Sequence, residues 1–221
     1  MVVGAAIAAR RSVRGFLDRP VEPRLLRDLA TRAGRAASGG NLQPWHIDLV
    51  HGATLAGLKA TMAAKLAAGD QEQPAYAIYP PSLDDPYETR RRAIGEAMYG
   101  EIGIPRDDRA ARRAWFARNF VFFGAPAALF VSVGTGMGPP QWSDLGQYLA
   151  SFMLLAVEAG LATCAQECWA MYPATVGAAL GLPAGRMLFC GMAVGYEDPA
   201  EPANRLRSVR AATGEWLTEH G

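Results

Sequence analysis

The sequence predicts one domain of the α+β class over residues 1–221, with a helical insert at about 68–118. Its 221 residues are 50% hydrophobic and 19% charged, which favours a chain that buries a sizeable core over a disordered one. Helical and strand patterns both occur along the chain, and neither an internal repeat nor a flexible linker separates them. A single folded unit is therefore expected.

The first half of the chain predicts two helices before the first strand and one after it. A helix beginning at Pro23 is favoured because proline is tolerated in a first helical turn and apolar residues then recur at helical spacing. Val13, Gly15 and Pro20 disfavour helix between this element and the first one. The expected elements are a helix at 2–9, an extended stretch at 10–20, a helix from 23 that ends before 37, a strand at 45–51 and a helix at 53–67.

The second half begins with a segment rich in Pro, Asp and Gln, which predicts an excursion from the body. The segment at 141–160 is apolar nearly all round, so it predicts a helix buried in a core or a subunit interface. The expected order is the excursion at 68–86, helices at 87–101 and 107–118, a buried strand at 125–133, a loop at 134–140, the helix at 141–160, a loop or short turn at 160–173, a helix at 173–181, a strand at 186–196 and a polar tail at 197–221.

Composition limits the classes of function. A net charge of +1 provides no electrostatic basis for binding nucleic acid or an anionic membrane. The only lysines are Lys59 and Lys65, so an anion site would be built from arginine. Cys164, Cys168 and Cys190 form neither a disulfide framework nor a zinc pattern, which predicts no metal site and a reducing, cytoplasmic location. No apolar run is long enough to span a bilayer, and we expect no membrane association.

Two arginine pairs lie near opposite ends of the chain. Arg10, Ser12 and Arg14 share one side if the chain is extended there, and this combination suits a phosphate. Arg205 and Arg207 share a side under the same condition. The two pairs form one anion site if the ends of the chain meet, as they often do in compact domains. The alternative is that both segments are ordinary solvated surface.

The stretch ASGGNLQPWHIDLV at 37–50 contains a polar, glycine-rich loop before a strand. Ser38, Asn41 and Gln43 can donate and accept hydrogen bonds, while Gly39 and Gly40 let a backbone approach a ligand closely. This chemistry suits a planar heterocycle with N–H and C=O edges. The alternative is a helix end followed by an asparagine turn.

These motifs together resemble the FMN-dependent nitroreductase family, most closely its nitrobenzoate-reductase-like branch. The similarity covers about 7–62 and 114–210, and includes Arg-Arg-Ser-x-Arg, Ser-Gly-Gly-Asn-x-Gln-Pro-Trp, FFGAP at 122–126 and NRLRS at 204–208. The resemblance implies a three-layer α+β fold, in which helices flank a central mixed or antiparallel sheet. It also implies an intertwined homodimer with two FMN sites at the subunit interface.

The resemblance further implies which residues bind FMN. Ala165 stands where the family usually has proline, and Cys168 rather than glycine follows Glu167. The implied set is Arg10, Arg11, Ser12 and either Arg205 or Arg207 around the phosphate; Arg14 with Gln43 near the pyrimidine edge; Ser38, Gly39 and Asn41 from the partner subunit; Asn119 at the polar edge; and Ala165, Gln166 and Glu167 beside N5 and the dimethylbenzene ring.

The implied activity is the reduction of a nitroaromatic or quinone-like compound by NAD(P)H through a ping-pong cycle. FMN carries the chemistry, so no side-chain nucleophile or base is needed. His46 and His51 alternate with apolar residues and are interpreted as structural. The insert at 68–118 would cover the open face of the flavin. Its arginines 90–92 could meet a substrate carboxylate or form an exposed helix face, and its aromatic residues could stack on substrate or pack.

Two other functions remain open on the sequence. One is a deiodinase-like or flavin-fragmenting relative on the same fold, although the lid of deiodinases includes a lysine and both lysines here precede the insert. The other is a flavin-binding protein without turnover. The sequence does not name the physiological substrate. It also does not decide between NADH and NADPH, because no G-x-G-x-x-G fingerprint is found in a strand-turn-helix context.

Overall fold

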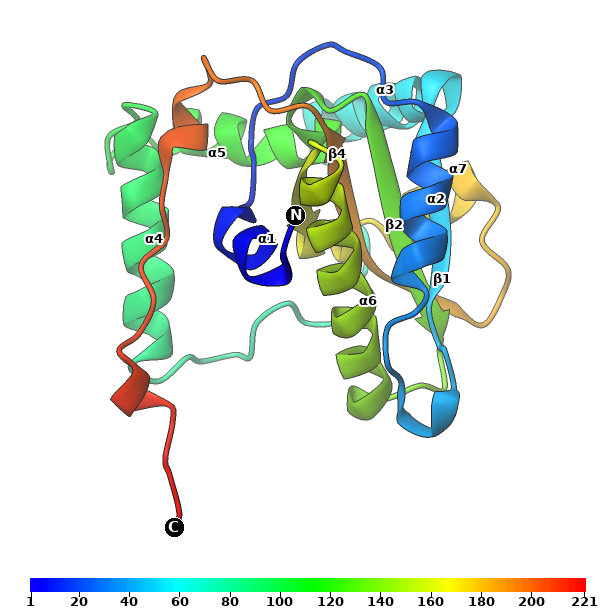
Figure 1. Ribbon diagram of the computed structural model, residues 1–221. Helices are drawn as coiled ribbons and strands as arrows, with labels where there is room; N and C mark the ends of the chain where they lie inside the picture. Colours follow the sequence, from blue (N-terminus) through cyan, green and yellow to red (C-terminus); the bar gives the residue numbers. More distant parts are fainter.

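A four-stranded antiparallel sheet of order β1-β2-β4-β3 lies at the centre of the fold in the computed structural model, which describes residues 1–221 (Figure 1). The strand β2 is almost entirely buried, as its continuous apolar run predicts. The strands are β1 (His46–His51), β2 (Ala127–Gly134), β3 (Ala162–Gln166) and β4 (Arg186–Gly195).

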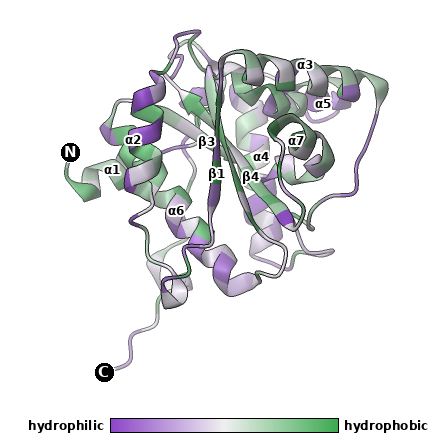
Figure 2. Ribbon diagram, turned by 90° about the vertical axis from the view of Figure 1, so that its right-hand side faces the viewer, coloured by the Kyte–Doolittle hydropathy of each residue, from purple (hydrophilic) through white to green (hydrophobic).

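Helices cover both faces of this sheet, which gives the three-layer arrangement expected (Figure 2). The helices are α1 (Val3–Ala9), α2 (Pro23–Ala33), α3 (Gly52–Ala68), α4 (Tyr87–Glu101), α5 (Arg109–Ala117), α6 (Pro139–Glu158) and α7 (Pro173–Leu180). Five short 3-10 turns join them: η1 (Gly39–Asn41), η2 (Arg118–Gly124), η3 (Glu167–Met171), η4 (Pro202–Arg205) and η5 (Thr213–Glu215). None of the helices combines the length and hydropathy that a membrane span requires.

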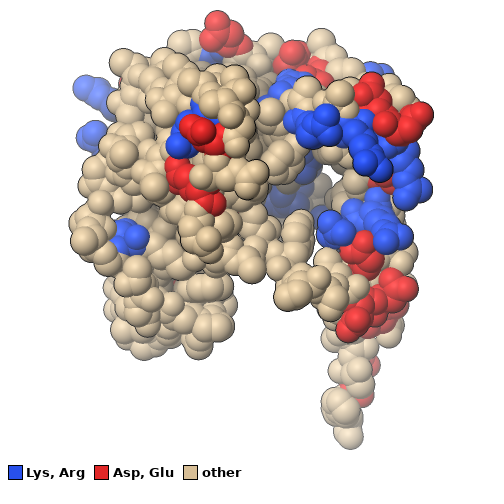
Figure 3. Space-filling view, turned by 180° about the vertical axis from the view of Figure 1, so that it is seen from behind, with Lys and Arg blue, Asp and Glu red and all other residues tan.

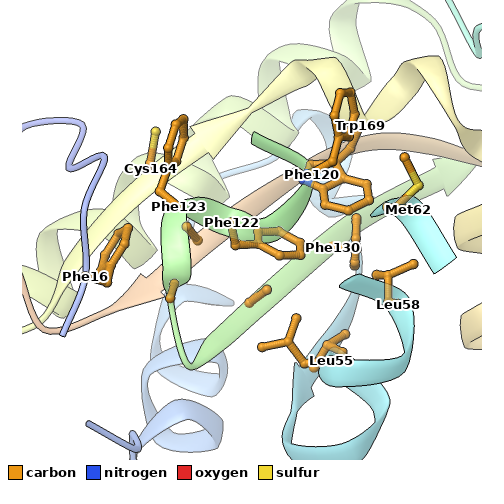
Figure 4. Close-up of a cluster of buried hydrophobic side chains, with 14 of the residues drawn as sticks. Phe16, Leu55, Leu58, Met62, Phe120, Phe122, Phe123, Phe130, Cys164 and Trp169 are labelled. Carbon is orange, nitrogen blue, oxygen red and sulfur yellow. The ribbon is translucent and has the colours of Figure 1, made fainter. Parts of the chain in front are cut away.

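The two faces of the sheet carry different cores. Helices α2 and α6 pack leucines and Phe152 against one face. On the other face, an aromatic cluster joins the α3 side chains Leu55, Leu58 and Met62 (Figure 4). In that cluster the Trp169 ring stacks on Phe122 at 4.6 Å between centroids and meets Phe130 edge-on. The functional residues described below lie where this aromatic core reaches the end of β3.

The segment 160–173, expected to be a loop or short turn, contains the strand β3 and the turn η3, so that expectation was wrong. Its residues Ala-Thr-Cys-Ala-Gln lack the large apolar side chains by which a strand is recognised. The strand forms because its neighbours supply hydrogen bonds: β4 pairs with it throughout, and the Val13 N–H donates to the Thr163 carbonyl at 3.0 Å. Tertiary pairing therefore decides this element.

The insert and the C-terminal tail form an arm beside the body (Figure 1). Helix α4 has no buried residue, in contrast to α6. The tail runs antiparallel to it, because Arg205 lies 4.0 Å from Glu101 at one end and Arg90 lies 2.9 Å from Glu215 at the other. We refer to α4 together with residues 205–216 as the arm.

Candidate functional site

The N-terminal segment after α1 is extended. It lies beside β3 and beside the residues that follow β4, which is the closeness of the two chain segments that a shared anion site would need. Ser12 forms a parallel bridge with Thr163, and Phe16 an antiparallel one with Glu197. The buried Asn204 accepts a hydrogen bond from the Arg14 N–H at 2.7 Å and donates to the Gly15 carbonyl at 2.9 Å. The segment after α1 and the segment around Asn204 therefore meet at Arg14.

The three arginines of this segment differ in their surroundings. The Arg11 guanidinium forms an ion pair with Glu197, and therefore part of its charge is already neutralised. Arg14 faces no carboxylate: its guanidinium donates one long hydrogen bond, of 3.4 Å, to the Ser12 carbonyl. Arg10 is half-buried and ends α1, with its backbone N–H bonded to Ala6. A free guanidinium at Arg14 is the cation that a polar ring edge or a phosphate would use.

Gln166, the last residue of β3, is held against Asn119 of η2. Its side-chain nitrogen donates to the Asn119 backbone carbonyl at 2.8 Å and to Asn119 Oδ1 at 3.1 Å. Gln166 is 3% exposed, yet its Oε1 has no hydrogen-bond partner. An unpaired buried carbonyl oxygen costs about 1–3 kcal/mol, so it is a position where a ligand N–H would be accepted.

The FFGAP stretch bends the chain just after Asn119. Phe122 and Phe123 have φ values of 52° and 53°, a left-handed conformation that is unfavourable for bulky residues. Both rings are buried in the aromatic core, and Phe122 stacks on Trp169. Burial of the two rings holds the strained turn in place, and the turn in turn holds Asn119 against Gln166.

The residues around Gln166 carry no reactive thiolate. Ala165 is exposed on β3, and Glu167, whose pKa is raised by desolvation, begins η3. Burial also raises the pKa of the Cys164 thiol, and raises the pKa of Cys168 to about 12. Because a thiolate is the nucleophilic form of cysteine, neither side chain is activated at neutral pH.

The loop 38–43 is folded by its own polar groups and by α6. The Ser38 hydroxyl accepts from the Gln43 N–H at 3.0 Å, and Gln43 Nε2 donates to Asn41 Oδ1 at 3.2 Å. Gly40, Asn41 and Gln43 all have positive φ, between 48° and 57°. The Gly39 N–H donates to both carboxylate oxygens of the buried Asp144, at 3.2 and 3.3 Å. The loop thus has a defined shape and an exposed polar edge.

This loop lies far from Arg14 within one chain. It contacts Asp144 near the start of α6, whereas Ser12 pairs with Thr163, which comes five residues after the end of α6 at Glu158. The helix rises about 20 Å between Asp144 and Glu158 at 1.5 Å per residue. One chain therefore presents the loop and the Arg14 segment as two separate sets of polar groups (Figure 1).

The second arginine pair lies on the arm. Arg205 is in η4, so the extended geometry under which Arg205 and Arg207 would share a side does not occur. Arg207 Nη1 donates to three consecutive backbone carbonyls, of Asn204, Arg205 and Leu206, at 2.9 to 3.0 Å. Its remaining nitrogens face no carboxylate. The arginine nonetheless follows directly from Asn204, which touches the Arg14 segment.

Sequence reasoning missed two residues that shape the site. In the sequence Asn204 is only the first residue of a basic motif, and its role follows from its hydrogen-bond partners across the fold. Asp144 had a clearer signal, because it is the only charged residue in the first 18 positions of α6. A single buried carboxylate on an apolar helix needs polar partners, and here the loop 38–43 provides them.

Comparison with known proteins connects this geometry to a family. The model of the nitroreductase family matches residues 7–196. The 4-nitrobenzoate reductase of Pseudomonas putida is 34% identical over 206 residues, which cover 93% of this chain and 90% of that protein.

Two crystal structures are similar over nearly the whole chain. The FMN and NADPH-dependent nitroreductase NfnB of Sphigopyxis sp. strain HMH superposes with a TM-score of 0.96 at 48% identity, covering 100% of both chains. The FMN-dependent nitroreductase NfnB of Mycobacterium smegmatis, solved in complex with NADPH, has a TM-score of 0.94 at 28% identity and covers 99% of this chain and 97% of that one.

Proposed function

This chain belongs to the nitroreductase family, and we propose that it is an FMN-dependent oxidoreductase that uses NAD(P)H to reduce nitroaromatic or quinone-like compounds. The observation that carries the proposal is the full-length similarity to an FMN and NADPH-dependent nitroreductase. The polar groups at Arg14, Asn119 and Gln166 agree with this activity. The cycle would be ping-pong if the coenzyme and the acceptor bind in turn at one site.

The residues at the end of β3 suit the flavin ring. Gln166 Oε1 is a buried acceptor without a partner, and Asn119 beside it supplies a second amide. Ala165 and Glu167 flank this position, and Ala165 lets a flat ring approach the strand because it has no bulk beyond Cβ. Amide groups of this kind recognise ring N–H and C=O groups by direct hydrogen bonding.

Arginine and serine supply the phosphate site in this proposal. Arg10 and Ser12 lie on the extended segment, and Arg205 or Arg207 follows Asn204, which is bonded to that segment. Arg11 supports the site indirectly, since it ties the segment to Glu197. Guanidinium groups are the preferred partners of phosphate oxygens.

Bound FMN supplies the redox step, which passes two electrons from NAD(P)H to the acceptor. Arg14 carries a positive charge with no carboxylate partner, and beside the ring edge it would stabilise the negative charge that reduction brings. No protein nucleophile takes part, and the raised thiol pKa values of Cys164 and Cys168 agree with that.

The complete site needs a second copy of the chain. The loop 38–43 and the Arg14 segment lie toward opposite ends of α6, so one chain cannot place both on one flavin. In a homodimer the loop of one subunit, with Ser38, Gly39, Asn41 and Gln43, serves the site of its partner. The exposed apolar residues of α1, Val3 at 69% and Ile7 at 59%, would be covered by that contact.

The insert at 68–118 serves as a lid over the substrate position. Its base is fixed, because Glu72 binds the start of α7 and the Tyr76 hydroxyl donates to the Phe189 carbonyl. Beyond that base, α4 has no buried residue and is free to contact a ligand or the partner. We also place the protein in the cytoplasm, where its three unpaired cysteines would stay reduced.

The test begins with the purified protein. FMN should bind and colour it yellow, and NADPH or NADH oxidation should rise on addition of 4-nitrobenzoate. Iodotyrosine should not be turned over, since both lysines lie in α3 and none in the insert. A colourless protein with no FMN affinity would contradict the proposal. Bound FMN without NAD(P)H oxidation would instead favour a flavin-binding protein without turnover.

A further inference from the structure

A large pocket lies between α4 and the C-terminal tail. Its volume is about 1110 Å³, and its walls are α4 from Thr89 to Ala97, the tail from Arg207 to Trp216, and Tyr79 of the insert. Figure 3 shows that Lys and Arg side chains gather on the arm, with Asp and Glu side chains among them. The pocket is far larger than a monocyclic nitroaromatic needs.

The wall of this pocket is strongly cationic. Arg90, Arg91, Arg207 and Arg210 line it together with one acid, Glu215. Without Arg207, which is one of the two arginines assigned above to the FMN phosphate, three positive charges and one negative charge leave a formal excess of two. Arg90 pairs with Glu215 at 2.9 Å, and Arg91 pairs with Glu88 of α4, also at 2.9 Å. Arg210 has no carboxylate partner, and donates only to the Ser208 hydroxyl and to backbone carbonyls.

Apolar and aromatic groups lie among these arginines. Trp216 is 68% exposed, Val209 is 93% exposed and Ile94 is 37% exposed, although all three are hydrophobic. The Arg91 guanidinium lies 5.4 Å from the centre of the Tyr79 ring. Exposed aromatic surface beside several guanidinium groups suits a ligand that combines a flat heterocycle with more than one phosphate.

We propose that this pocket binds the 2′-phosphoadenosine half of NADPH, and that Arg210, supported by Arg91, selects NADPH over NADH. This inference rests on the proposed function, because the coenzyme must reach the flavin. NADPH and NADH differ only in the 2′-phosphate, so discrimination requires a cation at that group. Arg210 suits it because its guanidinium is not occupied by a protein carboxylate. The Tyr79 and Trp216 rings provide the faces on which adenine stacks.

The test compares both coenzymes on the FMN-loaded wild-type protein and on the Arg210→Ala variant, with a fixed nitroaromatic acceptor. We expect kcat/KM for NADPH to fall by ~10- to 100-fold, as for loss of a charge-assisted hydrogen bond to phosphate, and kcat/KM for NADH to stay within about twofold. The Kd of 2′,5′-ADP, measured by calorimetry, should rise by a similar factor, while that of 5′-AMP stays unchanged. Arg91→Ala should act in the same direction, and Arg210→Lys should retain part of the preference.

Arg24→Ala is the matched control, because Arg24 is an exposed arginine of α2 without an ion pair and outside the pocket. It should change neither coenzyme's kcat/KM. An equal fall for NADPH and NADH in Arg210→Ala, or wild-type protein that binds 2′,5′-ADP no more tightly than 5′-AMP, would overturn the inference. Wild-type protein that oxidises neither coenzyme would instead contradict the proposed function. The two failures are therefore distinguishable.

Discussion

The Asn204 side chain holds the Arg14 backbone in place across 190 positions of the sequence. Its Oδ1 accepts from the Arg14 N–H at 2.7 Å, while its Nδ2 donates to the Gly15 and Asp198 carbonyls at 2.9 Å each. Asn204 is 4% exposed, so these bonds are shielded from water. One amide thus joins the segment of the first arginine motif to the segment of the second.

Asn204→Ala should therefore loosen both motifs together. Three backbone groups each lose a hydrogen bond, although the Gly15 carbonyl keeps the Asp198 N–H as a donor, and we expect the unfolding free energy to fall by about 1–3 kcal/mol. FMN affinity should fall as well, since Arg14 and Ser12 lose their support. Urea unfolding and an FMN titration measure the two effects. Asn204→Asp keeps the acceptor for the Arg14 N–H and loses the donor. Its stability and its FMN affinity should therefore lie between those of the wild type and those of Asn204→Ala. A stable variant with unchanged FMN affinity would contradict this role.

Arg14→Ala should lower the reduction potential of bound FMN. The guanidinium faces no carboxylate, so its charge is available to the reduced, negatively charged ring. A decrease of about 30 mV is equivalent to about 1.4 kcal/mol for a two-electron couple. Equilibrium titration against a reference dye measures it on the FMN-loaded protein. Arg14→Lys keeps the charge and should keep most of the potential, whereas an unchanged potential in Arg14→Ala would remove the residue from this role.

Gly191→Ala should destabilise the protein, because the added Cβ would lie 2.5 Å from Trp169 Cδ1. Trp169 is fully buried and stacked on Phe122, so it cannot move aside cheaply. We expect a loss of about 1–3 kcal/mol, typical of overpacking in a core. Gly57→Ala in α3 is the control: its Cβ would meet nothing within 4 Å, and the variant should be equally or more stable. Equal thermal midpoints for the two variants would contradict the prediction.

The Glu72 carboxylate should give a stability contribution that depends on pH. Burial opposes its charge, but hydrogen bonds from the Thr175 side chain and from the Thr175 and Ala174 N–H groups outweigh burial and lower its pKa below 4.5. A lowered pKa in the folded state means that the stabilisation is complete above pH 4.5 and is lost as the pH falls through the folded-state value.

Urea unfolding of wild type and Glu72→Gln at about pH 7 and about pH 3.5 tests this contribution. The difference in unfolding free energy should be large at the higher pH and should shrink at the lower one. Glu219→Gln is the control, because Glu219 lies exposed near the C-terminus. A difference that stays constant with pH would show that the Glu72 charge is not responsible.

Much of the fold could be predicted from local pattern. The buried strand β2 and the helix α6 were both evident, since each has an apolar run of suitable length and flanking turn residues. The strand β3 could not be predicted, because Ala162–Gln166 is a strand only by virtue of β4 and residues 12–13 on either side. Its pattern alone is that of a small-residue turn.

The site was predicted as a set of motifs and not as a geometry. Sequence spacing indicated that Arg10, Ser12 and Arg14 would share a side if the segment is extended, and the bridge between Ser12 and Thr163 shows that the backbone pairs there in an extended form. The same spacing gave a wrong prediction that Arg205 would be extended, because Arg205 lies in the 3-10 turn η4. The contacts of Asn204 and Asp144 reach across more than a hundred residues, so local sequence does not indicate their partners, although the isolated carboxylate on α6 does mark Asp144 itself.

The placement of the loop 38–43 leads to a prediction about mixed dimers. If the loop of one subunit completes the site of the other, a chain with a defective loop and a chain with a defective Arg14 segment can together form one intact site. We therefore expect FMN binding and turnover to return when Asn41→Ala and Arg14→Ala chains carrying different affinity tags are co-expressed and purified through both tags. Each variant alone should be weak, because both of its sites are then damaged.

The control for this experiment is a mixed dimer in which one chain carries both substitutions and the other is wild type. If the loop and Arg14 serve different subunits' sites, this arrangement damages both sites, and its activity should resemble that of the single variants. If the two groups instead serve one site within a chain, the pattern reverses: the wild-type chain keeps an intact site, and the Asn41→Ala and Arg14→Ala mixture has none. The separation of Asp144 and Thr163 along α6 favours the first result.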